Sequence, residues 1–173
     1  NICYDKTKDD LSMEALYFIG GILEHCRGIT ALVCPTDICY STRFNSPWVS
    51  SEGNWGLFDR TCLIRVKPSK NNTHFEFRLP SSLANPYLIL ASLLCAGIDG
   101  LKNKISPPKE KEYKYKLPTT LTGALSELGK DKSFSNAFDP FFIKNYIITK
   151  ELEIEEMKDF KEKKIKPIAY SRL

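Results

Sequence analysis

Histidine and methionine are scarce in this sequence, which has two of each among its 173 residues. The six cysteines include no CxxC pair and no other metal-type spacing, and with only two histidines a zinc site has few ligands to draw on. Most of the cysteines stand inside apolar runs such as "CLIRV" and "LLCAG", where a reduced thiol acts as a small hydrophobic group. A reducing, cytoplasmic setting is therefore expected.

The sequence also lacks an apolar run of the roughly 20 residues that a membrane-spanning helix needs. The nearest run, "PYLILASLLCAGIDG", is shorter and contains Asp99, so it predicts a buried helix. No secretory signal is recognised ahead of the sequon at Asn71, which is interpreted as part of a loop. We expect no transmembrane segment.

An excess of basic charge is small, because 25 Lys and Arg residues face 21 Asp and Glu residues. The lysine-rich runs "LKNKISPPKEKEYKYK" and "KDFKEKKIK" both contain acidic residues, which is typical of a solvated face and not of a phosphate-binding stripe. No nucleic-acid partner is predicted.

Hydrophobic residues make up 42% of the chain, enough for one sizeable core and a single domain over residues 1–173. Capping residues and apolar periodicity predict a helix over 12–26, a long loop over 34–56, a hairpin over 60–79, a core helix over 85–101 and C-terminal helices over 119–164. Gly20 and Gly21 weaken the first helix, so they predict close packing against a neighbour.

The predicted hairpin carries an ionic face. In "THFEFRLP", Glu76 and Arg78 alternate with phenylalanines, and Arg65 of "RTCLIRV" joins them if the two strands pair in that register. Two guanidinium groups with a carboxylate can hold an oxyanion and a divalent metal. The same residues also fit an ordinary arginine–glutamate network on an exposed sheet face, and the spacing alone leaves both interpretations open.

Four stretches resemble, in order, the C-terminal part of the catalytic domain of class I glutamine synthetases. They are "FIGGILEHCRGITALVCPT", "WGLFDRTCLIRV", "FEFRLPSSLANPYLILASLLCAGIDGLKNKI" and "LTGALSEL". The resemblance covers nearly the whole chain and implies an α+β fold, in which helices back an antiparallel sheet. That family joins ammonia to glutamate through a phosphorylated intermediate.

The resemblance also implies roles for the ionic residues. Arg60 and Arg65 match arginines at the transferred phosphate, so Arg60 is a catalytic candidate and Arg65 a nucleotide-binding candidate. Glu76 matches a metal ligand, and Arg78 matches the catalytic arginine at the substrate side-chain carboxyl.

The departures from the family pattern lie in the loop. Against the pattern "NPTTNSYKRLVPGYEAP", Thr42 falls at the arginine that binds the substrate α-carboxylate, and Trp48 at the glutamate that accepts a proton from ammonium. A one-residue slip in the alignment offers Arg43 for the lost arginine, and Glu52, four residues beyond position 48, is the nearby residue that could offer a carboxylate. His74 stands where many members carry an arginine at the nucleotide. Because tryptophan offers only a donor N–H, it cannot replace the base.

This pattern is most similar to the glutamine synthetase-like proteins of the vertebrate lens, a branch thought to lack ligase activity. The resemblance implies a catalytically inactive protein with a structural or chaperone-like role in the cytoplasm, associated with the cytoskeleton or the membrane periphery. It implies a dodecamer, intermediate filament partners such as vimentin and beaded-filament proteins, and no required cofactor, with weak binding of Mg²⁺ or Mn²⁺ and ATP as a remnant. The alternative is an ATP-dependent ligase with an altered amine or acid substrate.

Overall fold

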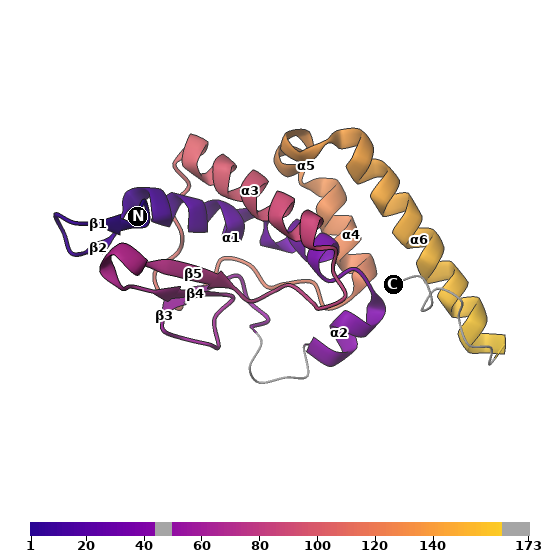
Figure 1. The fold of residues 1–173 in the computed structure, drawn as a ribbon. Helices are drawn as coiled ribbons and strands as arrows, with labels where there is room; N and C mark the ends of the chain where they lie inside the picture. Colours follow the sequence, from indigo (N-terminus) through magenta and orange to yellow (C-terminus); the bar gives the residue numbers. More distant parts are fainter. Residues whose placement is uncertain (44–49, 164–173) are drawn as a thin grey trace.

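Helices and a small sheet share one core in the computed structural model, which describes residues 1–43 and 50–163 (Figure 1). In chain order the elements are β1 (Tyr4–Asp5), β2 (Asp10–Leu11), α1 (Met13–Val33), α2 (Asp37–Arg43), β3 (Trp55–Leu57), β4 (Ile64–Lys67), a 3-10 turn (Lys70–Asn72), β5 (His74–Phe77), α3 (Pro86–Asn103), α4 (Leu121–Lys130), α5 (Lys132–Phe138) and α6 (Pro140–Lys163). The α+β class expected from the sequence is therefore confirmed.

Helix α1 is the central helix of the fold. Ser12 caps it by accepting a hydrogen bond from the Ala15 N–H, and most of the residues that follow are buried. The helix extends to Val33, well beyond the predicted end at residue 26, and its last residues are buried. Gly28 packs against α4, where an added Cβ would lie 3.3 Å from the Leu128 Cα. Its length and hydropathy would suit a membrane span, but 72% of its most apolar window is buried inside the fold.

Helices α1 and α3 approach each other through glycine. A Cβ on Gly21 would overlap the carbonyl oxygen of Ala96 and the backbone of Gly100, and a Cβ on Gly100 would overlap the carbonyl oxygen of Tyr17. Gly20 meets the backbone of Ile105 in the same way. The paired glycines, which disfavour helix formation locally, thus permit the close contact that the sequence analysis expected of them.

Helix α3 begins where predicted, with Asn85 as its N-cap and Pro86 at its first position. The prediction that α3 is the central core helix is wrong, because its buried positions are small residues facing α1. Four of its large apolar residues lie outward, namely Tyr87 (80% exposed), Leu90 (60%), Leu94 (54%) and Ile98 (43%).

The predicted hairpin is present as the antiparallel pair β4 and β5. The prediction of a loop over residues 34–56 is wrong in part, since α2 and β3 both fall inside it. Strand β3 pairs with β4 in parallel, so the three-stranded sheet is mixed and not wholly antiparallel. The segment before α4 stabilises β3, because the Trp55 Nε1–H donates to the Pro108 carbonyl (2.8 Å) and the Lys111 N–H to the Trp55 carbonyl (2.8 Å).

Three helices close the fold behind α1. Helix α4 buries its predicted apolar face, which consists of Leu121, Ala124, Leu125 and Leu128. Asp131 then ends α4 and caps α5, a helix that the sequence analysis did not separate from its neighbours. Helix α6 starts at Pro140 and is fastened to α1 by a hydrogen bond from the Tyr146 hydroxyl to the Ala31 carbonyl (2.8 Å).

The α1–α3 crossing makes a stability prediction. Gly21→Ala should lower the free energy of unfolding by about 1–3 kcal/mol or more, because the added methyl group meets backbone atoms that cannot move aside. Equilibrium urea unfolding of the protein measures this change. Gly129→Ala is the matched control: its Cβ would meet only the Ile147 Cδ1 at 3.6 Å, and alanine favours the helix. Equal effects of both substitutions would contradict the packing argument.

Candidate functional site

The hairpin brings three of the predicted site residues together. Arg65 on β4 stands directly opposite Glu76 on β5 in the strand register, and Arg78 follows two positions later on the same face. The Nη1 of Arg65 lies 3.4 Å from the Oε2 of Glu76. The Nη1 of Arg78 lies 2.7 Å from the Oε1 of Glu76. Each oxygen of the carboxylate therefore faces a different guanidinium.

This ionic trio, Arg65, Glu76 and Arg78, is only partly open to solvent. The arginine side chains are 16% and 21% exposed, whereas that of Glu76 is 44% exposed. The Nε of Arg65 is buried and has no hydrogen-bond acceptor in the described part of the chain. Two cations against one anion leave a net positive charge, and guanidinium groups suit phosphate or carboxylate oxygens. The trio can thus bind an oxyanion.

A complete metal site is absent from the described residues, in which no group of three metal-binding side chains occurs. Glu76 offers a single carboxylate, and both of its oxygens already take part in ion pairs with arginine. The predicted metal role of Glu76 would therefore require ligands from elsewhere in the protein.

Arg60 lies apart from the trio. It occupies the turn between β3 and β4 and is exposed, and its side chain forms no ion pair with a described residue. The neighbouring Asp59 holds this turn by accepting hydrogen bonds from the Thr61 N–H (2.8 Å) and hydroxyl (2.7 Å). Hydrogen bonds from Thr61 lower the pKa of Asp59. Hydrogen bonds within the turn therefore stabilise it, and Arg60 lies exposed in this turn.

The structure places two of the three residues that depart from the family pattern, Thr42 and His74. Thr42 lies near the end of α2 and donates its hydroxyl hydrogen to the Ile38 carbonyl (2.7 Å), one turn earlier in the same helix. His74 is exposed on β5, where its Nδ1–H donates to the Asn72 carbonyl (2.7 Å). Trp48 lies outside the described residues. Position 42 therefore presents a short neutral group whose hydroxyl is engaged within its own helix.

The cysteines behave as core residues. All six, each within the described part of the chain, are free thiols, and four of them are buried. Burial raises the pKa of the Cys26 thiol to about 12. A thiol with so high a pKa is a poor nucleophile at neutral pH, so Cys26 is a structural residue.

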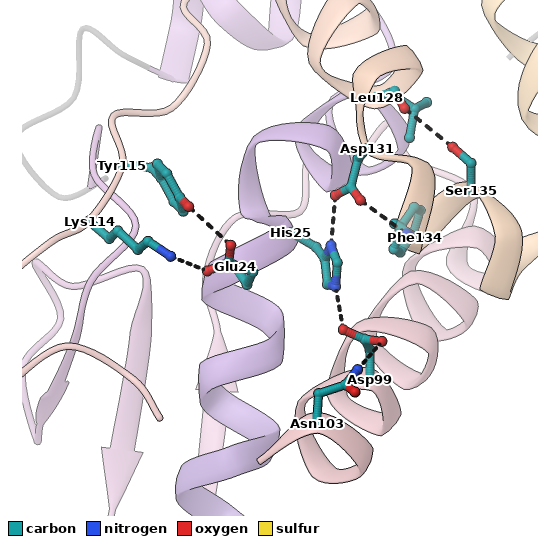
Figure 2. A network of polar contacts seen from close by, with 10 residues as sticks. All are labelled: Glu24, His25, Asp99, Asn103, Lys114, Tyr115, Leu128, Asp131, Phe134 and Ser135. Carbon is teal, nitrogen blue, oxygen red and sulfur yellow. Dashed lines mark hydrogen bonds and ion pairs between the residues drawn. The ribbon is translucent and has the colours of Figure 1, made fainter. Parts of the chain in front are cut away.

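A second polar cluster escaped the sequence analysis (Figure 2). His25 of α1 lies between two carboxylates, with its Nδ1 2.6 Å from Asp131 Oδ2 and its Nε2 3.0 Å from Asp99 Oδ2. Burial by itself would lower the pKa of His25, but the hydrogen bonds that Asp131 and Asp99 accept from the ring outweigh it and raise that pKa. An aspartate in an apolar helix indicates a buried polar partner. The sequence does not identify the partner of Asp99, because His25 lies 74 residues away.

The chain is similar to known proteins over most of its length. The family model for the catalytic domain of glutamine synthetase matches residues 1–170. Glutamine synthetase of Thermococcus kodakarensis is 38% identical over 164 residues, which cover 86% of this chain and 37% of the relative. Glutamine synthetase of Methanosarcina mazei is 33% identical over 174 residues (91% and 39%), and that of Pyrococcus abyssi 36% over 177 residues (94% and 40%).

The chain thus spans about two fifths of the length of these relatives. The family match extends over all the described elements, from β1 to α6, and includes the strands that carry the ionic trio. This chain belongs to the glutamine synthetase catalytic-domain family.

Proposed function

We propose that this chain is the C-terminal part of the catalytic domain in a family member that no longer makes glutamine. The side chain at position 42 is the observation that carries the proposal. An arginine there would pair with the α-carboxylate of glutamate, whereas Thr42 is uncharged, short and hydrogen-bonded to Ile38. In the sequence, Trp48 adds a second loss, because an indole cannot accept the proton of ammonium.

The ionic trio supports a residual affinity for anions. Arg65 and Arg78 remain in place on paired strands and can contact the phosphate and carboxyl groups that the family handles, with Arg60 at the edge of the same sheet. Glu76 would add one ligand to a Mg²⁺ or Mn²⁺ ion held mainly by other residues. His74 in place of an arginine removes a permanent charge, so ATP binding should be weak.

The present role would be structural. The resemblance to lengsin, the glutamine synthetase-like protein of the vertebrate lens, favours a cytoplasmic, chaperone-like protein that organises intermediate filaments, with vimentin or beaded-filament proteins as partners. The exposed stripe on α3, which consists of Tyr87, Leu90, Leu94 and Ile98, supports assembly into a large homo-oligomer, since apolar patches of this kind mark contact surfaces. Such a protein would need no cofactor.

A ligase with an altered amine or acid substrate is the second candidate. The retained trio favours it, because two guanidinium groups beside one carboxylate keep a net positive charge that suits phosphate or carboxylate oxygens. The names of the relatives also point to ligase chemistry. Activity measurements separate the two candidates.

The full-length protein should form γ-glutamyl hydroxamate at least about 100-fold more slowly than a catalytic relative, because general-base catalysis alone contributes about 10²- to 10⁴-fold. Glutamine synthetase of Thermococcus kodakarensis is a suitable positive control. An ATP-dependent rate close to that of the control would contradict the loss of glutamine synthesis. Turnover with another amine or acid would favour the second candidate.

Calorimetry with ATP and Mg²⁺ should give binding weaker than micromolar. Arg65→Ala should weaken the binding further by about 10- to 100-fold, since a hydrogen bond to a charged group contributes about 1.5–3 kcal/mol. Arg27→Ala is the control, because Arg27 pairs with Glu127 (2.8 Å) and not with the trio. Micromolar affinity, or equal losses in the two variants, would be evidence against the weak remnant site.

Light scattering should show that the full-length protein is a large oligomer. Leu90→Asp should shift it toward smaller species, because the substitution places a charge in the middle of the exposed α3 stripe. Thr149→Asp, at an exposed polar position on α6, should leave the size unchanged. A monomeric unsubstituted protein would exclude the assembly proposal.

A further inference from the structure

His25 has partners on both of its ring nitrogens, and both partners are acceptors. The side chain is 4% exposed and lies between Asp131 and Asp99 (Figure 2). A neutral imidazole has one N–H donor and one acceptor nitrogen, whereas an ionised carboxylate only accepts hydrogen bonds. A neutral His25 would therefore direct one lone pair at a carboxylate oxygen. Only the imidazolium form donates to both.

The charges around His25 come from three sides. Asp99 on α3 and Asp131 at the junction of α4 and α5 face the ring directly, while Glu24 and Lys114 line the same cavity of about 510 Å³. Glu24 and Lys114 neutralise each other through a 2.7 Å ion pair. Two carboxylates and one imidazolium therefore form the charge balance at the ring, and this balance favours the protonated state.

Asp131 is both a partner of the His25 ring and the residue at which α4 ends and α5 begins. It ends α4, and its Oδ1 caps α5 by accepting a hydrogen bond from the Phe134 N–H (3.0 Å). Its Oδ2 accepts from His25 of α1. Asp99 is also held in place, because its Oδ1 accepts from the Asn103 amide (2.9 Å) on α3. The ring of His25 on α1 thus links Asp99 of α3 to Asp131 at the α4–α5 corner.

We propose that protonated His25 is a pH-dependent clamp that fastens the α4–α5 corner to α1 and α3 and releases this corner when the proton is lost. The inference does not depend on the proposed function. Because Asp131 and Asp99 raise the pKa of His25 in the folded state, the clamp is fully present below the ordinary pKa of about 6.5 and is lost as pH rises through the raised value. Alkaline and not mildly acidic conditions should loosen the corner.

Nuclear magnetic resonance of the full-length protein with labelled histidine tests the charge state. The ring signal that disappears in His25→Gln belongs to His25. Below and at neutral pH it should have the shifts of an imidazolium, and it should change only above the ordinary histidine range of about 6.5. A neutral ring at pH 7 would overturn the proposal.

Hydrogen exchange of the Phe134 amide tests the release. After correction for intrinsic exchange, the opening constant should rise by up to about tenfold for each pH unit between the ordinary and the raised pKa. Asp131→Asn keeps an N-cap but removes one of the two carboxylates that raise the pKa of His25, so this pH dependence should weaken. Asp139→Asn is the control, because Asp139 caps α6 through Phe141 and Phe142 without a histidine partner, and it should keep the dependence.

These measurements decide the question even if one variant does not fold. An opening constant of the unsubstituted protein that stays constant across the histidine range would refute the clamp. The same pH dependence in Asp131→Asn as in the unsubstituted protein would also refute it.

Discussion

The fold depends on the close crossing of α1 and α3. Glycines at the crossing let the two backbones meet, with Gly21 against Ala96 and Gly100 against Tyr17. This contact places α1 in the centre, with the sheet, α3 and α4 around it (Figure 1). Gly28 lies closer to the C-terminal end of α1 and packs against α4, and that end of the helix is buried. The hairpin and the His25 cluster are both positioned against this one helix.

The proposed functional positions lie on two kinds of structural element, the strands of the sheet and the helix α2. The ionic trio lies on and next to the paired strands β4 and β5. The backbone hydrogen bonds between these strands fix Arg65 opposite Glu76 without any ligand. Thr42 lies instead near the end of α2, outside the sheet, whereas Trp48 lies outside the described residues. A change at position 42 can remove chemistry without disturbing the core, and the strands then keep the geometry of a binding site.

Two clusters of oppositely charged side chains lie partly or fully buried in the described part of the chain. In the trio one carboxylate separates two guanidinium groups, and at the α4–α5 corner one imidazolium separates two carboxylates. Each arrangement offsets the cost of removing charge from water, which an isolated buried ion could not do. The difference lies in the central group: the glutamate is partly exposed and within reach of a ligand, whereas the histidine is enclosed and holds helices together.

The sequence by itself determined the local features. Caps at Ser12 and Asn85 set helix starts, because an N-cap depends on residues within one turn. Alternation in "THFEFRLP" put Glu76 and Arg78 on one face, and the motifs established the family. Only the tertiary structure decided that α1 continues past Gly28, that α3 turns Leu90 outward, and that His25 meets Asp131 across 106 residues. These features depend on which distant backbone fills the space beside a residue, and no local pattern encodes that.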